Sequence, residues 1–243
     1  MGKKVISSTT TANQPILNPW TNQPIPNPWL NIGWNLDRVA DCDKSYLASW
    51  PKSKYIQTTT LPEPYTGDVN SDVYCLNLNP GDACITTASA PQIMQNFQTY
   101  IQQTLRHSIK DNMWLLPLFQ GTAGYTWWQQ KTKWLRGWLQ KNKNRQDPRM
   151  FVIEYFPYHT PKGMKFPTNL PSYAYSDQLI RQAMADGKYI IIMRHWNEWL
   201  KRIPGLATYG KLARSKSPQN PCLTANNIDT LGNFPLVNLL NAF

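Results

Sequence analysis

Short apolar runs occur at intervals from about residue 72 onward, and each has the length of a buried strand. Residues 72–78, 151–156 and 189–193 are such runs, and residues 211–215 look like a fourth strand. Asn79-Pro80-Gly81 directly follows the first run. Apolar runs of about four to eight residues that end in turn residues are typical of strands in a buried sheet.

Between these runs, the apolar residues recur at helical spacing. Ile93, Phe97, Ile101 and Leu105 mark one face of a helix expected over residues 90–107. Ser176 is a candidate N-cap for a helix that ends at Gly187. We expect further helices over residues 127–143 and 195–202, and in the apolar stretches that finish the chain.

The alternation of strands and helices defines the fold class. It predicts an α/β protein, a three-layer α/β/α sandwich with a central four-stranded, mainly parallel sheet. Ligands in such folds bind beyond the carboxyl ends of the strands. We therefore look for functional residues directly after each predicted strand.

A Pro- and Trp-rich segment precedes the predicted body. Residues 13–20 and 22–29 form a short tandem repeat whose prolines favour an extended path. We expect an N-terminal extension over residues 1–60 and one catalytic domain over residues 61–243. Trp20, Trp29 and Trp34 either pin the extension onto the body or touch DNA.

Composition adds a strongly basic character. The 243 residues carry a net charge of +11, which favours an anionic partner, nucleic acid before a membrane surface, over charge that serves solubility alone. Eleven Trp and twelve Tyr residues suit base stacking as well as core packing. No apolar run approaches the length of about 18 residues that spans a bilayer, and the start lacks a signal-peptide core. We expect a cytoplasmic, DNA-associated bacterial protein that is a monomer without a membrane partner.

The cysteines do not suggest a metal centre. Cys42, Cys75, Cys84 and Cys222 are widely spaced, whereas zinc ligands usually come in closer pairs. We expect four reduced thiols, no metal and no cofactor.

Two motifs follow the first and the last predicted strands. Asn79-Pro80-Gly81 follows the first, and Ser215-Lys-Ser-Pro-Gln-Asn-Pro221 follows the last. The pair resembles the uracil-DNA glycosylase superfamily, in which these motifs run G-[MI]-N-P-G and, in the single-strand-selective monofunctional branch, H-P-S-P-R-N-P. The mismatch-specific branch is similar as well. The resemblance covers residues 60–225 in the order of elements, with identical residues only in these motifs.

The resemblance implies a monofunctional glycosylase of the uracil-DNA glycosylase fold that hydrolyses the N-glycosidic bond of a flipped base. Asn79 is the residue that orients a water toward the sugar, and Leu78, Pro80 and Gly81 belong to the base-binding turn. Without the second motif, Asn79 would be expected only to cap its turn. Ser215 replaces the family's His, which stabilises charge on the leaving base, and Lys216 replaces the next Pro. Help for the leaving group then comes from Ser215, Lys216 or Arg214.

Glu154 occupies the position at which several branches place an Asn that recognises a pyrimidine. A carboxylate accepts from the exocyclic amine of cytosine, and a protonated Glu donates to its ring nitrogen, whereas ionised Glu154 repels the carbonyl of uracil. The alternative is a buried ion pair with Arg194 or another cation. Glu154 therefore favours a cytosine-type base.

Ordinary cytosine is excluded as a substrate because its removal would destroy the host genome. The leading expectation is a hypermodified base in phage DNA, such as glucosylated hydroxymethylcytosine, removed in antiviral defence to leave an abasic site. Tyr158, His159 and the Trp-rich helix are candidates to line a pocket wide enough for a sugar. The same positions also suit a core.

The remaining candidates contact DNA. Leu223 follows the last motif, where relatives insert an apolar wedge, but core packing explains it equally well. The expected DNA contacts are Arg214, Lys216, Ser217, Gln219, Asn220 and Leu223, and the wider set of phosphate contacts adds Lys131, Lys133, Arg136, Lys141, Lys143 and Arg145. Three alternatives stay open: a uracil or deaminated-base repair glycosylase, an inactive DNA-binding protein on the same fold, and a glycan- or nucleotide-binding α/β protein.

Overall fold

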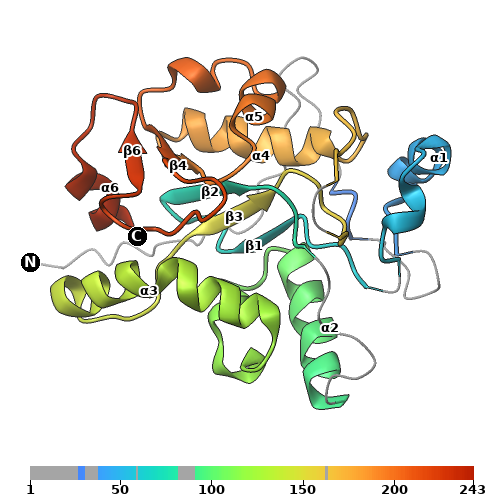
Figure 1. Ribbon diagram of the computed structural model, residues 1–243, viewed down its shortest axis with the longest axis horizontal. Coiled ribbons are helices and arrows are strands. Elements are labelled where there is room, and N and C mark those ends of the chain that lie inside the picture. The colour runs from blue at the N-terminus through green and yellow to red at the C-terminus, as the bar shows by residue number, and fades with distance from the viewer. Residues whose placement is uncertain (1–26, 31–37, 59, 82–90, 162–163) are drawn as a thin grey trace, which may run out of the picture.

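Within the described residues, six strands form one mixed sheet at the centre of the protein (Figure 1). The computed structural model describes residues 27–30, 38–58, 60–81, 91–161 and 164–243. The order across the sheet is β1-β3-β2-β4-β5-β6. The strands are β1 (Tyr65–Gly67), β2 (Val73–Asn77), β3 (Phe151–Glu154), β4 (Tyr189–Ile192), β5 (Leu212–Ser215) and β6 (Ile228–Thr230).

The four central strands β3, β2, β4 and β5 are parallel, and they correspond to the four predicted strands. All five residues of β2 are buried, as expected for a strand with neighbours on both sides and helices on both faces. The α/β class is therefore confirmed. The predicted four-stranded sheet is too small, because β1 and β6 add antiparallel edges. Each edge strand has only three residues, too few to produce a recognisable alternation.

Helices lie on both sides of this sheet. Figure 1 shows α4 and α5 on one side, and α2 and α3 on the other. The α-helices are α1 (Asp41–Ser49), α2 (Pro91–Leu105), α3 (Ala123–Lys143), α4 (Tyr173–Ala185), α5 (Trp196–Arg202) and α6 (Leu236–Ala242). Single 3-10 turns occur at η1 (Ser53–Tyr55), η2 (Met113–Leu115), η3 (Pro117–Phe119) and η4 (Leu206–Thr208).

The helix boundaries have local causes. The α3 helix begins where the Thr122 side chain accepts a hydrogen bond from Tyr125 N over 3.2 Å. The α4 helix ends before Gly187, whose φ of +69° suits glycine, as predicted. Its predicted start was wrong, because Ser176 lies buried inside α4 and the helix begins at Tyr173. The helix thus extends three residues, Tyr173 to Tyr175, beyond its candidate cap.

The described part of the predicted N-terminal extension packs on the body. Trp29 is buried, with its ring 6.0 Å from that of Tyr158, and the α1 residue Leu47 joins the same core. Asp43 of α1 is fully buried and accepts hydrogen bonds from Tyr158 Oη (2.7 Å) and Ser172 N (2.9 Å). Trp29 therefore pins this segment onto the body, which is the first of the two expected roles. Trp20 and Trp34 lie outside the described residues.

The chain path creates a switch point at the carboxyl ends of β2 and β4. After β2 the chain continues to α2 on one side of the sheet, and after β4 it enters α5 on the other side (Figure 1). Ligands in open α/β sheets bind where neighbouring strands diverge in this way. The candidate site is therefore built from the segments that follow the central strands.

Candidate functional site

The Asn79-Pro80-Gly81 turn is held by the segment that follows β3. Phe156 N donates to Leu78 O over 2.9 Å, and Thr160 N donates to Gly81 O over 3.0 Å. Gly81 has a φ of +76°, which a side chain would strain. Asn79 Nδ2 donates to Thr160 Oγ1 over 3.1 Å. This bond fixes the amide and leaves Asn79 Oδ1 without a hydrogen-bond partner among the described residues.

Glu154 is a buried acid at the end of β3. It lies opposite Asn77 in the parallel register and is only 6% exposed. Asn77 Nδ2 donates to Glu154 Oε1 over 3.0 Å, whereas Glu154 Oε2 has no partner among the described residues. Burial raises the pKa of Glu154 to about 8, although the Asn77 hydrogen bond and the Arg194 charge both lower it. We therefore expect Glu154 to be neutral below about pH 8, with the unpartnered Oε2 as the oxygen available to carry the proton.

A protonated Glu154 can recognise more than one type of base. An ionised Glu154 would repel the carbonyl of uracil, but a neutral carboxyl offers one donor and one acceptor. It can donate to the ring nitrogen of cytosine and accept from its amine. A neutral carboxyl can also pair with the edge of uracil, so electrostatic rejection of uracil operates only above the pKa of Glu154.

Arg194 follows β4 and lies between the two motifs. Its guanidinium carbon is 5.4 Å from the centre of the Trp127 ring, and its Nη2 donates to Gln219 O over 3.4 Å. Burial lowers the pKa of Arg194, and an ionised Glu154 would partly offset this effect. No close ion pair joins these two described side chains, so the alternative of a direct Glu154–Arg194 pair is not met. Arg194 is bound instead to the last loop, at Gln219 O.

Asn227, which follows the last loop, holds that loop together. Its Nδ2 donates to Ser215 Oγ (3.1 Å) and to Cys222 O (2.8 Å). Its Oδ1 accepts from Ser217 N over 3.0 Å, and its backbone O accepts from Lys216 N over 2.8 Å. One amide side chain thus contacts both ends of the Ser215–Pro221 loop.

Ser215 is left with a proton to donate. Its Oγ accepts from Asn227 Nδ2 and, over 3.3 Å, from Ser217 N. A hydroxyl has two acceptor positions and one donor, so both acceptor positions are used and the O–H remains. Ser215 can therefore act as a hydrogen-bond donor at the carboxyl end of β5.

A cavity of about 350 Å³ opens at the carboxyl ends of β4 and β5. It is lined by Ile192, Met193, Arg194, Trp196, Arg214, Ser215, Lys216 and Pro218. Three of these side chains are basic and none is acidic. Neither Asn79 nor Glu154 lines this cavity. The Asn79-Pro80-Gly81 turn and the Ser215–Pro221 loop therefore lie at the same edge of the sheet, but only the second contributes to the cavity.

Two predicted pocket residues are buried in the core instead. Tyr158 is 2% exposed, and its hydroxyl is bound to Asp43 of α1. His159 is 3% exposed, with Nε2 3.8 Å from Oε2 of Glu63. The expectation that Tyr158 and His159 line an open sugar pocket was wrong, because the segment before residue 61 packs over them.

Leu223 is also a core residue. It is 2% exposed, and its backbone N donates to Lys131 O over 2.8 Å. The expected apolar wedge is therefore wrong in this conformation, and the alternative of core packing holds. The other expected contacts of this loop, Ser217, Gln219 and Asn220, are half-buried or exposed.

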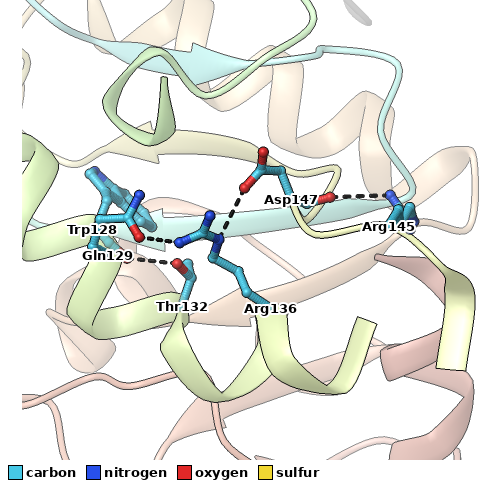
Figure 2. A network of polar contacts seen from close by, with 6 residues as sticks. All are labelled: Trp128, Gln129, Thr132, Arg136, Arg145 and Asp147. Carbon is cyan, nitrogen blue, oxygen red and sulfur yellow. Dashed lines mark hydrogen bonds and ion pairs between the residues drawn. The ribbon is translucent and has the colours of Figure 1, made fainter. Parts of the chain in front are cut away.

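The basic residues of α3 fall into two groups. Lys131 is buried and donates to Asn220 Oδ1 over 2.6 Å, so it fastens the last loop to α3. Figure 2 shows Arg136 between Gln129 and Asp147, both of which bind its guanidinium, and Arg145 beside Asp147. These three cations have structural partners. Lys133, Lys141 and Lys143 are exposed.

Sequence reasoning missed Asn227 and gave Arg194 only a secondary role. Arg194 directly follows a strand, so the rule that found Asn79 could have found it. Asn227 lies twelve residues after Ser215 in an unpatterned stretch, and the sequence gives no sign of its contacts.

The described residues give no sign of a metal site or a membrane span. No cluster of three or more His, Cys, Asp or Glu side chains in the described part of the chain is placed to hold a metal ion. No helix there has the length and apolarity to cross a membrane. Cys42, Cys75 and Cys222 are free thiols, and Cys84 lies outside the described residues.

Comparisons with known proteins give no match: no family model, no curated protein and no solved structure is significantly similar to this chain.

Proposed function

We propose that this chain is a monofunctional DNA glycosylase that acts on a flipped, modified cytosine. The observation that carries the proposal is the arrangement of Asn79, Glu154 and Ser215 at the carboxyl ends of three parallel strands of one sheet. The net charge of +11 supports an anionic substrate. The motif resemblance supplies the reaction class.

Asn79 would orient the attacking water. Cleavage of the glycosidic bond develops positive charge on the sugar and negative charge on the leaving base. An amide is not a base, so its contribution is the positioning of a water at the anomeric carbon. The Asn79–Thr160 hydrogen bond supports this role, because it fixes the amide and leaves Oδ1 available to accept from a water.

Ser215 would stabilise the leaving base. Its available O–H can donate to an oxygen on which negative charge develops. A hydroxyl is a weaker donor than a protonated imidazole. The nearby Arg194, Arg214 and Lys216 charges, which line the same cavity, would add electrostatic stabilisation.

Glu154 would recognise the cytosine edge in its neutral form. Oε2–H donates to the ring nitrogen, and the carboxyl accepts from the exocyclic amine. The Asn77 hydrogen bond to Oε1 supports this orientation, because it assigns the proton to Oε2. Recognition of the base edge alone does not distinguish a modified cytosine from ordinary cytosine. The substrate must therefore carry an added group, such as a glucosylated hydroxymethyl group.

The test is base release from defined DNA. The full chain is incubated with DNA containing uracil, cytosine, hydroxymethylcytosine or glucosylated hydroxymethylcytosine, and released bases and abasic sites are measured by mass spectrometry. We expect release of a modified cytosine only. Asn79→Ala should reduce the rate by about 100-fold or more while the fold is retained. Asn70→Ala, at an exposed asparagine in a turn, is the matched control.

Two outcomes would support other functions. Release of uracil without release of any modified cytosine would favour a repair glycosylase and would end the role proposed for Glu154. Salt-dependent DNA binding without base release from any substrate would favour a DNA-binding protein that lacks the chemistry. The second outcome is suggested by one observation, the Ser215 in place of the family's His.

A further inference from the structure

The cavity between β4 and β5 has an unusual charge balance. Of its three basic side chains, Arg214 is paired, with Nε 3.0 Å from Oδ2 of Asp229. Lys216 is exposed, and its ammonium group has no bonding partner among the described residues. Arg194 Nε is buried without a hydrogen-bond partner in the described part of the chain. The cavity thus presents about two positive charges that are not compensated by a neighbouring carboxylate.

The charge suits one class of anion better than another. An internal phosphodiester carries a single negative charge, whereas a phosphate monoester carries about −1.5 to −2 at pH 7. Two uncompensated cations and the free O–H of Ser215 match the second group in charge and in hydrogen-bond donors. A terminal phosphate therefore fits this cavity better than the interior of a strand.

Aromatic and apolar side chains form the rest of the cavity. Trp196 lines it and lies under the Arg214 guanidinium, whose carbon is 5.3 Å from the ring centre. Arg194 is held in the same way over Trp127. Trp196 and Pro218 offer surfaces on which a flat ring can pack. The volume of about 350 Å³ is within the range of roughly 300–1,000 Å³ of small-molecule sites.

We infer that this cavity binds a nucleoside monophosphate, with the phosphate monoester at Arg194 and Lys216 and the base packed toward Trp196. The ligand is either a free mononucleotide or the phosphorylated end of a DNA strand, which share this chemistry. The inference goes beyond base excision and does not require Asn79 or Glu154, which take no part in the cavity. It shares Arg194, Ser215 and Lys216 with the role proposed above for the leaving base.

Binding of the full chain to small probes tests the phosphate. Calorimetry would compare deoxycytidine monophosphate, deoxycytidine and inorganic phosphate at low ionic strength. We expect the monophosphate to bind at least about tenfold more tightly than either fragment, because a charged hydrogen-bonding group and a stacking surface both contribute. Equal binding of nucleoside and monophosphate would overturn the inference. Equal binding of inorganic phosphate and monophosphate would overturn the role of Trp196.

Two variants and a control locate the site. Arg194→Gln and Lys216→Gln should each weaken monophosphate binding by about tenfold or more, whereas Lys110→Gln, the same change at an exposed position outside the cavity, should not. Lys216 is exposed, so its variant tests the site without risk to the fold. Equal effects of Lys216→Gln and Lys110→Gln would overturn the inference.

Competition with oligonucleotides separates the two sources of ligand. A 5′-phosphorylated single strand and its 5′-hydroxyl counterpart would compete with labelled deoxycytidine monophosphate. Stronger competition by the phosphorylated strand supports a strand end, and competition by free mononucleotide alone supports a metabolite. Equal competition by both strands, at least as strong as that of the mononucleotide, would show that phosphodiesters suffice and would overturn the inference.

Discussion

Asn227 Nδ2 donates a hydrogen bond to Ser215 Oγ over 3.1 Å, although the two residues lie on opposite sides of the last loop. The same amide contacts Ser217 N and Cys222 O. The Ser215–Pro221 loop therefore has an internal scaffold that does not depend on a bound ligand. Ser215 keeps its orientation only as long as this scaffold is intact.

Removal of this amide should loosen the loop. Asn227→Ala removes side-chain hydrogen bonds to Ser215, Ser217 and Cys222, each of which contributes about 0.5–1.5 kcal/mol. We expect a loss of about 1–3 kcal/mol in the free energy of unfolding, measured by urea denaturation. Base release should fall as well, because the Ser215 hydroxyl loses its fixed direction.

Asn226→Ala is the control, because Asn226 is exposed and adjacent. Asn227→Asp separates the contacts, since it keeps an acceptor for Ser217 N and loses the donor to Ser215. An Asn227→Ala variant as stable and as active as Asn226→Ala would contradict the role of this residue.

The buried Glu154 should make stability depend on pH. Its pKa is about 8 in the folded protein and 4.5 in a solvated chain. Between these values the unfolded chain has lost the proton and the folded protein still holds it, so stability falls as pH rises from about 4.5 to 8. Above pH 8 both states are ionised and this contribution is constant. Glu154→Gln cannot ionise and should remove a decrease on the order of a few kcal/mol.

Urea denaturation of both proteins at pH 5 and pH 8.5 gives the measurement. The wild type should lose more stability than Glu154→Gln between the two values. Burial also raises the pKa of Glu63, so a decrease of the same sign should persist in the variant. Parallel curves for the two proteins would show that Glu154 is ionised in the folded state.

The regular elements could be predicted because each has a strong local pattern. The β2 strand begins with four apolar residues, and α3 buries Trp128, Lys131, Thr132, Leu135 and Leu139 along one face. The α1 helix was missed because its apolar content is low and only Asp43 and Leu47 are buried. That omission also explains the error at Tyr158, since the hydroxyl that seemed available belongs to a contact with α1.

The candidate site could be predicted only where residues follow strands directly. Asn79 follows β2, and Glu154 and Ser215 end β3 and β5, so the strand pattern placed all three at one edge of the sheet and the motif resemblance supplied their roles. Asn227 could not be found, since its contacts depend on how the chain returns after the loop. The raised pKa of Glu154 depends on burial by distant segments, which no local pattern records.

Lys131 and Lys133 should have opposite roles, although they are two residues apart on α3. Lys131 is buried and donates to Asn220 Oδ1 over 2.6 Å, whereas Lys133 is exposed. Lys131→Met keeps the apolar stem and removes the hydrogen bond, so we expect a loss of about 1–2 kcal/mol in unfolding free energy. Lys133→Met should leave stability within about 0.5 kcal/mol of the wild type.

The two lysines should also differ in their effect on DNA affinity. If α3 tracks a phosphate backbone, Lys133→Met should weaken DNA binding and lower its salt dependence by about one counterion. Lys131→Met should change the salt dependence less, because its ammonium group is already bound within the protein. Both parameters come from fluorescence anisotropy at several salt concentrations. Identical salt slopes for Lys133→Met and the wild type would remove α3 from the DNA contact surface.

Asp43 should stabilise the fold far more than its neighbour Asp41 does. Asp43 is fully buried and accepts from Tyr158 Oη and Ser172 N, whereas the Asp41 side chain is 80% exposed and forms an ion pair with Lys44. Asp43→Ala leaves a buried hydroxyl and a buried N–H without this acceptor, each at a cost of about 1–3 kcal/mol. We expect a loss of about 2–4 kcal/mol in unfolding free energy, because Ala40 N donates to Tyr158 Oη and cannot replace the lost acceptor.

Asp41→Ala has the same change in charge and composition on the same helix turn, and it should alter stability by less than about 0.5 kcal/mol. Urea denaturation at pH 7 distinguishes the two variants. Asp43→Asn should fall between them, since it keeps one acceptor oxygen for Ser172 N or Tyr158 Oη and loses the other. If Asp43→Ala unfolds at the same urea concentration as Asp41→Ala, the α1 helix is not held by this acid, and the burial of Tyr158 must depend on its ring contacts with Trp29 and Phe156 instead.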